Sequence, residues 1–229
     1  MEIKKITTTQ IFAPSGHKRP DSFDDFIGQQ QIKKMLKTAI GSAKKREGNL
    51  GHTLFAGPSG FGKTTMAHVI AKQLGVGVKL VTAYAISKPS EIVSLLNSLE
   101  QGDVLFIDEI HRLKPTVEEV LYIAMEDFVI DMVMPEGGSV RIPINPFTLI
   151  GATTRPEMLS QPMKNRFVYR FHFMDYSFEE KQVIIERYLQ QYQLSFSPSL
   201  LREMAQKVDS VPREIHNLVI KLRDFFVNH

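Results

Sequence analysis

The sequence predicts an α/β fold in which helices flank a parallel β-sheet, followed by a small all-helical domain. Three observations predict it. A glycine-rich segment at residues 57–65 joins an apolar strand pattern to a helical pattern. Apolar segments alternate with amphipathic ones up to about residue 152, which is how parallel sheets covered by helices are built. After about residue 174 only helical patterns remain, so we expect a change of domain there.

Composition sets limits on the class of protein. The chain has 229 residues, of which 43% are hydrophobic and 23% are charged, as in ordinary globular domains. It has no cysteine, so disulfides and thiolate metal sites are excluded and a cytoplasmic location is expected. No apolar run is long enough for a membrane span, and no signal-peptide core follows the N-terminal lysines. The net charge of +3 permits a polyanionic partner without arguing for one.

The chain is predicted to have three parts. Residues 1–16 form a loosely ordered lead, residues 17–174 a large sheet domain, and residues 175–229 a small helical domain. The first helix carries apolar residues from Ile32 to Ala43 on one side, and its many lysines are predicted to form a solvated face.

Strands and helices follow in turn. Strands are predicted at 53–56, 78–82, 103–107 and 147–152, with helices after Lys63, at Pro89 and through residues 118–125. Alternating patterns around a Pro/Gly turn predict a β-hairpin at about 130–142. Beyond residue 174, a capping box at 177–180 begins a helix to about Gln191, and Ser-Pro and Ser-Val-Pro segments begin two more.

The glycine-rich segment has the spacing of a phosphate-binding loop. Four residues separate Gly57 from Gly62-Lys63-Thr64, and the segment lies between a strand and a helix. Glycines let backbone N–H groups point at phosphate oxygens, and the helix start adds a favourable dipole. Lys63 can reach the outer phosphates, and the Thr64 hydroxyl can bind Mg²⁺. The predicted loop consists of Gly57, Pro58, Ser59, Gly60, Phe61, Gly62, Lys63, Thr64 and Thr65.

A pair of carboxylates completes the predicted chemistry. The apolar strand at 103–107 ends in Asp108-Glu109, and in a parallel sheet this end can face the phosphate loop. Asp108 can hold the hydration shell of Mg²⁺, and Glu109 can polarise a water that attacks the γ-phosphate. The pair therefore predicts ATP hydrolysis to ADP with Mg²⁺. Capping of the next helix by these two residues is the alternative.

These segments resemble the AAA+ ATPases, a class of P-loop nucleoside triphosphatases, and within them the RuvB family of Holliday junction branch-migration motors. The resemblance runs from Arg19 to Phe225 and is most specific at residues 102–113 and 146–155. It implies a large ATPase domain with a helical lid, in a protein of DNA recombination and repair.

The resemblance also implies roles for individual residues. Arg19, Ile27 and Pro212 would enclose adenine and ribose, and Thr153 or Thr154 would be the first sensor of the γ-phosphate. Arg213 would be the second sensor. Arg166 would be an arginine finger that enters a neighbouring subunit's site, with Arg155 as a weaker candidate. His111 is expected to position the site, because Glu109 already supplies the base.

An arginine finger in trans requires an oligomer, and the resemblance implies a hexameric ring. It also implies that the hairpin docks a RuvA-like partner, for which exposed Ile130, Met132, Val133 and Met134 would be suited; burial of these residues against the chain's own core is the alternative. RuvB proteins have a longer hairpin tip with an Ala-Arg-Ser run, and a C-terminal winged-helix domain that contacts DNA. This sequence stops at His229, so we expect DNA contact only within a fuller assembly.

Two other functions stay open at this stage. One is a nucleotide-gated adaptor that recruits a partner and hydrolyses little ATP. The other is a clamp-loader-like subunit, which keeps the same chemistry with a different partner.

Overall fold

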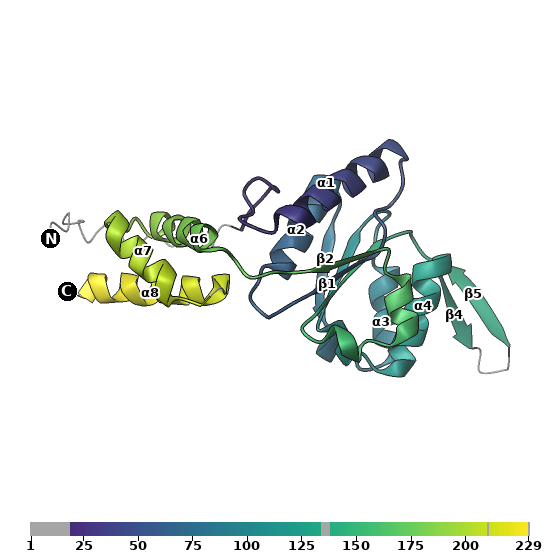
Figure 1. The fold of residues 1–229 in the computed structure, drawn as a ribbon. Helices are drawn as coiled ribbons and strands as arrows, with labels where there is room; N and C mark the ends of the chain where they lie inside the picture. The colour runs from purple at the N-terminus through teal and green to yellow at the C-terminus, as the bar shows by residue number, and fades with distance from the viewer. Residues whose placement is uncertain (1–18, 134–137, 210, 229) are drawn as a thin grey trace. The chain divides into compact units, whose positions relative to one another are not determined.

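The computed structural model describes residues 19–133, 138–209 and 211–228 (Figure 1). These residues form two compact units. The larger unit comprises Gln30–Pro58 and Lys63–Phe173. The smaller unit comprises Ser59–Gly62 together with the described parts of Met1–Gln29 and Met174–His229. In the part of the chain that is described, no helix is long and apolar enough to cross a membrane.

A five-stranded parallel sheet forms the centre of the larger unit. Its strands follow the order β2-β3-β6-β1-β7. Their bounds are β1 Thr53–Ala56, β2 Val78–Thr82, β3 Val104–Asp108, β6 Thr148–Thr153 and β7 Tyr169–His172.

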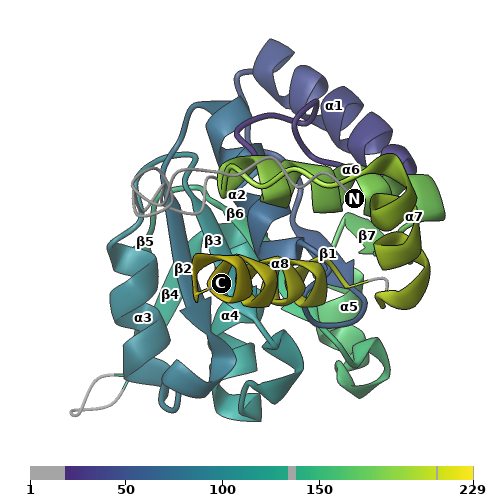
Figure 2. The same ribbon diagram turned by 90° about the vertical axis from the view of Figure 1, so that its left-hand side faces the viewer.

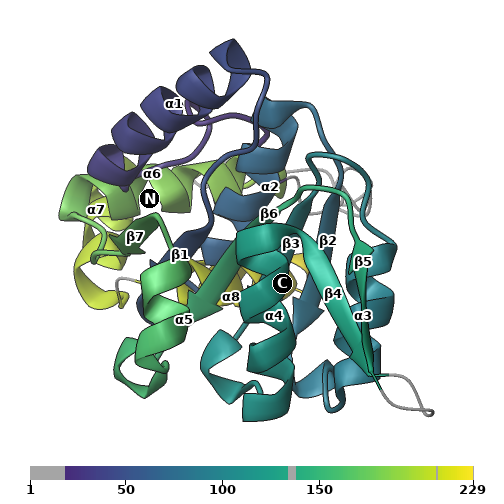
Figure 3. The same cartoon turned by 90° about the vertical axis from the view of Figure 1, so that its right-hand side faces the viewer.

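Helices cover both faces of this sheet, as predicted. The chain moves from β1 to the far edge strand β2 and then returns across the sheet. Because crossovers between parallel strands are right-handed, this reversal places α3, α4 and α5 opposite α2. Figures 1 and 3 show α1 and α2 on one face and α3, α4 and α5 on the other. The helices are α1 Gln30–Lys45, α2 Lys63–Leu74, α3 Pro89–Asn97, α4 Pro115–Asp127 and α5 Gln161–Arg166.

The central strands are buried along their whole length. All residues of Val104–Ile107 and Thr148–Thr153 are buried, which agrees with the continuous apolar runs that identified these strands. Leu105, Ile107 and Leu149 pack with residues of α3, α4 and α5 in one hydrophobic cluster. This packing holds the strand ends that carry the site.

The edge strand β7 was not predicted. It is four residues long, and its side chains alternate between outer and inner faces, so its sequence lacks the apolar run of a central strand. Only Phe171 is fully buried, and its ring lies 6.2 Å from the ring of Phe55 on β1. Pairing with β1, and not local sequence, makes this segment a strand.

Strands β4 Val129–Val133 and β5 Ser139–Pro143 form a separate antiparallel hairpin at the end of α4 (Figure 3). For Ile130 the alternative of burial holds, and its exposure for partner docking is excluded: it is only 1% exposed and belongs to the core of the larger unit. Ile130 lies at the base of the hairpin, and its side chain packs against the core of the larger unit. Met134 lies outside the described residues, as do the side chains of Met132 and Val133.

The smaller unit contains three helices, α6 Phe178–Gln191, α7 Pro198–Lys207 and α8 Pro212–Asn228 (Figure 2). The predicted capping box begins α6: Ser177 Oγ accepts from Glu180 N, and Glu180 Oε2 accepts from Ser177 N at 2.9 Å. Helix α6 contacts both other helices. Whether a domain boundary lies at residue 174 remains a prediction.

Candidate nucleotide site

Three neighbouring strands bring Gly57, Asp108 and Thr154 to one edge of the sheet, the edge formed by the carboxyl ends of the strands. Strand β6 lies between β1 and β3, and all three are parallel. Ala56 is in register with Thr153, and Ile107 is in register with Gly151, so Gly57, Thr154 and Asp108 all lie at the carboxyl end. Strands in a sheet are about 4.8 Å apart, so the ends of β1 and β3 are separated by about 10 Å. A phosphate chain and a metal ion fit such a spacing.

The phosphate loop leaves β1 in a conformation that only glycine adopts easily. Gly57 has φ +138°, and its N–H donates to Thr153 O at 3.1 Å. A Cβ at Gly57 would lie 3.1 Å from the backbone oxygen of Phe173. The backbone therefore needs a residue without a side chain here.

Lys63 begins α2 and is buried, with 6% of its surface exposed. Its Nζ donates to Gly57 O and to Pro58 O, each at 2.7 Å. The ammonium group is thus held against the start of the loop, where its positive charge and the N-terminal end of α2 both favour an anion. Thr64 and Thr65 follow in the first turn of α2 and are half-buried.

The middle of the loop, Ser59–Gly62, groups with the smaller unit. Tyr176 donates its hydroxyl hydrogen to Phe61 O at 3.0 Å, and the two rings are 6.0 Å apart. Arg213, in the first turn of α8, donates to Ser59 Oγ at 3.2 Å. These contacts connect α8 and the segment before α6 directly to loop residues. Burial raises the pKa of Tyr176 well above its usual range, so its hydroxyl remains a donor.

Asp108 ends β3, and Glu109 follows in the left-handed region with φ +51° and ψ +44°. For a non-glycine residue this conformation costs about 1–3 kcal/mol and is often found at functional sites. It turns the chain into the short helix Ile110–Arg112. The Glu109 carboxylate accepts from the Thr154 hydroxyl at 3.0 Å and from Thr154 N at 3.3 Å. Thus the ends of β3 and β6 are joined through the candidate base.

His111 lies directly behind Glu109. Its Nδ1 is 2.8 Å from Thr153 Oγ1 and 3.2 Å from Glu109 Oε2, while its buried Nε2 has no hydrogen-bond partner among the described residues. A buried N–H without a partner costs more than a bare acceptor nitrogen, so we assign the proton to Nδ1. Burial lowers the pKa of His111, which keeps the ring neutral near pH 7. The neutral ring then donates to Thr153 Oγ1 and lies against the carboxylate of Glu109, the candidate base.

The structure separates the two sensor candidates. Thr153 is fully buried, and its hydroxyl is occupied by His111 and by Arg155 N at 3.0 Å. The Thr153 side chain thus supports the interior of the site, and its contact with nucleotide remains a prediction. Thr154 is half-exposed and contacts Glu109, which favours it as the sensor. Arg155 is exposed. Its guanidinium donates a hydrogen bond to Met158 Sδ at 3.8 Å.

Arg166 lies in the last turn of α5, with 24% of its side chain exposed. Its guanidinium donates to Glu126 Oε2 at 2.8 Å and lies over the Tyr122 ring at 4.8 Å from the ring centre. This environment was not foreseen from the sequence, because Tyr122 and Glu126 lie about forty residues earlier, on α4. A sequence signal for these contacts is an aromatic and an acidic residue spaced four apart on one helix, because both side chains can then contact one guanidinium.

The other predicted nucleotide contacts belong to the smaller unit. Arg19 is exposed and Ile27 is half-buried in the segment before α1, and Pro212 occupies the first position of α8. Except for the contact of Arg213 with Ser59, the structure does not test these assignments.

Mg²⁺ suits the groups at this edge. It prefers one or two carboxylate ligands and completes its shell with water and phosphate oxygens. Asp108 and Thr64 supply oxygen atoms of that kind. Among the described residues there is no group of three or more His, Asp or Glu side chains that could hold a metal without a nucleotide.

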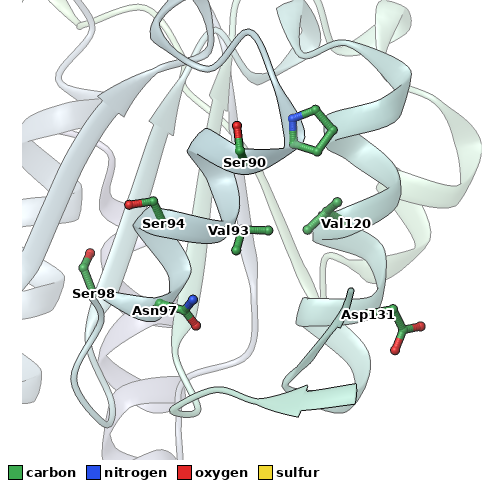
Figure 4. Close-up of a pocket in the computed structure, with 8 residues that line it drawn as sticks. Ser90, Val93, Ser94, Asn97, Ser98, Val120 and Asp131 are labelled. Carbon is green, nitrogen blue, oxygen red and sulfur yellow. The ribbon is translucent and has the colours of Figure 1, made fainter. Parts of the chain in front are cut away.

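A separate shallow groove lies away from this edge, between α3, α4 and β4 (Figure 4). Ser90, Ser94 and Asn97 line it from α3, Val120 from α4 and Asp131 from β4. Asp131 is paired with Arg141 on β5 at 3.1 Å. None of the predicted site residues lines this groove.

Comparisons with known proteins identify relatives of this chain. The profile of the Holliday junction DNA helicase RuvB P-loop domain matches residues 18–173. The Holliday junction branch migration complex subunit RuvB of Campylobacter curvus is 43% identical over 228 residues, which is 98% of this chain and 67% of that protein. The subunit of the same name from Lactiplantibacillus plantarum is 45% identical over 210 residues, covering 90% of this chain and 62% of the relative.

A solved structure of the Thermotoga maritima RuvB Holliday junction branch migration motor matches with a TM-score of 0.81 and 40% identity. The match covers 90% of this chain and 65% of that one. A variant of the same Thermotoga maritima protein matches with a TM-score of 0.85. The chain thus spans about two thirds of the length of its relatives, including their phosphate-loop domain. From these matches and the site geometry, the chain belongs to the RuvB family.

Proposed function

We propose that this chain is the ATP-hydrolysing part of a motor subunit that drives branch migration of Holliday junctions in DNA recombination and repair. One observation carries the proposal: the phosphate loop, Thr154 and the Asp108-Glu109 pair share one edge of the sheet. Membership of the RuvB family supplies the substrate class, because the relatives are named as branch-migration subunits.

In this proposal the loop residues hold the phosphates of ATP. Backbone N–H groups of residues 57–64 and the Lys63 ammonium bind phosphate oxygens. Thr64 and Asp108 would hold Mg²⁺, which would supply positive charge that offsets the charge of the phosphates. For Lys63 to reach the outer phosphates, its Nζ exchanges contacts with Gly57 O and Pro58 O for phosphate oxygens.

Glu109 orients the attacking water and accepts its proton. Thr154, which now donates to Glu109, is placed to bond the water or the γ-phosphate when ATP is present. His111 packs against the Glu109 carboxylate, with its Nδ1 3.2 Å from Oε2, and limits the positions that the carboxylate can take. Arg166 acts on the ATP of a neighbouring subunit in a ring, and such a finger typically accelerates turnover by about 10³–10⁵.

Contributions of Arg19, Ile27, Pro212, Arg213 and Arg155 to nucleotide binding are further proposals that rest on the family. Arg213 has additional support, because its guanidinium already contacts Ser59 in the phosphate loop. A cytoplasmic location is also proposed from the family's action on DNA junctions.

We also propose that the hairpin binds a RuvA-like partner. Val140 on β5 is 48% exposed and lies on the same face as Ile142, whose neighbour Ile130 packs in the core. The apolar face that is buried at the hairpin base therefore continues to an exposed valine. Val140→Asp is expected to weaken partner binding in a pull-down or titration while ATP binding is unchanged. Equal partner affinity for both proteins would reject this docking site.

The test of hydrolysis is Glu109→Gln, assayed at concentrations that allow assembly, with partner and DNA added. Turnover is expected to fall at least 100-fold, on the order expected for loss of a general base, while ATP binding is retained. Glu100→Gln is the matched control, because Glu100 is exposed in the turn before β3, at the opposite end from Glu109. ATP binding without turnover in the unsubstituted protein would instead support a nucleotide-gated adaptor.

A further inference from the structure

A buried polar cluster lies beneath Arg166, between α4 and α5. Glu118 on α4 is only 8% exposed, and its Oε2 accepts from the Tyr122 hydroxyl and, at 2.9 Å, from Ser160 Oγ. The Tyr122 and Ser160 hydroxyl oxygens are also 2.7 Å apart. Neither the phosphate loop nor the carboxylate pair uses these three side chains.

Ser160 links this cluster to the helix that carries Arg166. It is the N-cap of α5, where its Oγ accepts from Met163 N at 3.3 Å. Helix α5 has only six residues, so its two ends are about 9 Å apart. A displacement of Ser160 therefore also displaces Arg166, because fewer than two helical turns separate them.

Tyr122 links the cluster to the guanidinium itself. Its ring lies beneath the Arg166 guanidinium at 4.8 Å, and its backbone oxygen accepts from Arg166 Nε at 3.4 Å. Burial, followed by the hydrogen bond to Glu118, raises the pKa of the Tyr122 hydroxyl, so it remains protonated and keeps donating. The hydroxyl bond to Glu118 fixes the ring, and the ring limits where the guanidinium can lie.

Both ends of α5 are thus attached to the same two turns of α4. Val117 and Leu121 on α4 and Met163 on α5 are completely buried around the cluster. A polar group buried among such residues is costly unless it is hydrogen-bonded, and Glu118 accepts from both hydroxyl groups, which holds Tyr122 and Ser160 against α4.

We propose that Glu118, Tyr122 and Ser160 are positioning residues that set the orientation of Arg166 for its action on a neighbouring subunit. This rests on the proposed function, since it takes Arg166 to be the trans-acting arginine. Catalysis by a charged group depends steeply on its placement, and a displacement of 1 Å can reduce rate about 100-fold. Holding the guanidinium in advance also reduces the conformational freedom that it loses in the transition state.

The test uses Tyr122→Phe, which keeps the ring and removes only the hydroxyl, and Ser160→Ala. ATP turnover is measured at saturating protein concentration, with KM determined for each variant. We expect kcat to fall about tenfold while KM for ATP changes less than about twofold, because only transition-state stabilisation is lost. If either variant does not fold, as judged by thermal melting, Glu118→Gln provides a milder test, because it replaces the charged acceptor by a neutral amide and weakens the same hydrogen bonds.

Two matched controls make the same types of substitution at other positions, so that an effect of losing a hydroxyl in general can be told from an effect of losing it in this cluster. Tyr84 also lies beneath an arginine, with Arg112 at 5.8 Å, but it is 67% exposed, so Tyr84→Phe is expected to leave kcat unchanged. Ser197 is the N-cap of α7 and accepts from Leu200 N, so Ser197→Ala removes a comparable cap elsewhere. It is expected to lower the melting temperature with no selective loss of kcat.

A double-variant comparison separates positioning from general structure. In the Arg166→Ala background, Tyr122→Phe is expected to cause no further loss of kcat, because it acts through the missing guanidinium. An equal tenfold loss in both backgrounds would overturn the positioning role. So would full activity of Tyr122→Phe and Ser160→Ala when Arg166→Ala is impaired. If Arg166→Ala itself retains full turnover, the trans-acting assignment in the proposed function fails.

Discussion

Gly57→Ala is predicted to destabilise the protein through one close contact in the phosphate loop. The Cβ would lie 3.0 Å from Phe173 Cβ, 3.1 Å from Phe173 O and 3.3 Å from Phe173 N. The Phe173 backbone has little room to yield, because its N–H donates to Ala56 O at 2.8 Å. The substitution also forces alanine to φ +138°. Backbone strain of about 1–3 kcal/mol and overpacking of a similar size add to about 4 kcal/mol.

For a chain of this length, that free energy corresponds to a melting temperature lower by about 8–16 °C. Gly75→Ala is the control, because Gly75 has φ +79° but a Cβ there would have no atom within 4 Å. Its cost is limited to the backbone preference, about 1–2 kcal/mol. Calorimetry or circular dichroism of both variants gives the comparison. Equal melting temperatures for the two variants would refute the claim that Phe173 closes the space beside the loop.

Three other perturbations test the site and the core. Lys63→Ala is expected to weaken binding of a fluorescent ATP analogue about 10–150-fold, which is the range for loss of a charged hydrogen bond. Unchanged affinity in an equilibrium titration would contradict the contact of Lys63 with phosphate. Burial lowers the pKa of His52, whose Nε2–H donates to Met125 O at 3.0 Å and whose Nδ1 accepts from Leu149 N at 2.8 Å. Because the pKa of His52 is lower in the folded state than the unfolded value of about 6.5, its contribution to stability is present above pH 6.5 and decreases as the pH falls below that value. Urea unfolding of wild type and His52→Gln at pH 7 and pH 5.5 measures this, and the same decrease in both would exclude His52 as the cause. Gly41→Ala, inside α1 where a Cβ meets nothing within 4 Å, is expected to raise the unfolding free energy by about 0.5–1 kcal/mol in the same assay.

The strands that carry the site were predictable because their signals are local. Residues 104–107 and 148–152 are continuous apolar runs, and such runs indicate strands buried on both faces. The loop spacing at 57–64 and the Asp108-Glu109 pair could then be assigned to strand ends. Strand β7 lacked a local signal, since its conformation comes from pairing with β1.

The detailed roles of individual side chains were less predictable. Ile130 and Thr153 looked available in the sequence, but the first is 1% exposed and the second is fully buried. Burial depends on which other segments pack over a residue, and those segments lie far away in the sequence. The contacts of Arg166 with Tyr122 and Glu126 have the same origin.

By itself the sequence determined the parallel α/β class, the phosphate loop, the carboxylate pair and the family. Short-range spacing and periodicity encode each of these, because a loop, a strand and a helix form from neighbouring residues. Tertiary structure alone decided that Thr154 and not Thr153 is presented beside Glu109, and that α4 holds Arg166. Those outcomes depend on strand order and helix packing, which bring together residues 40 or more positions apart.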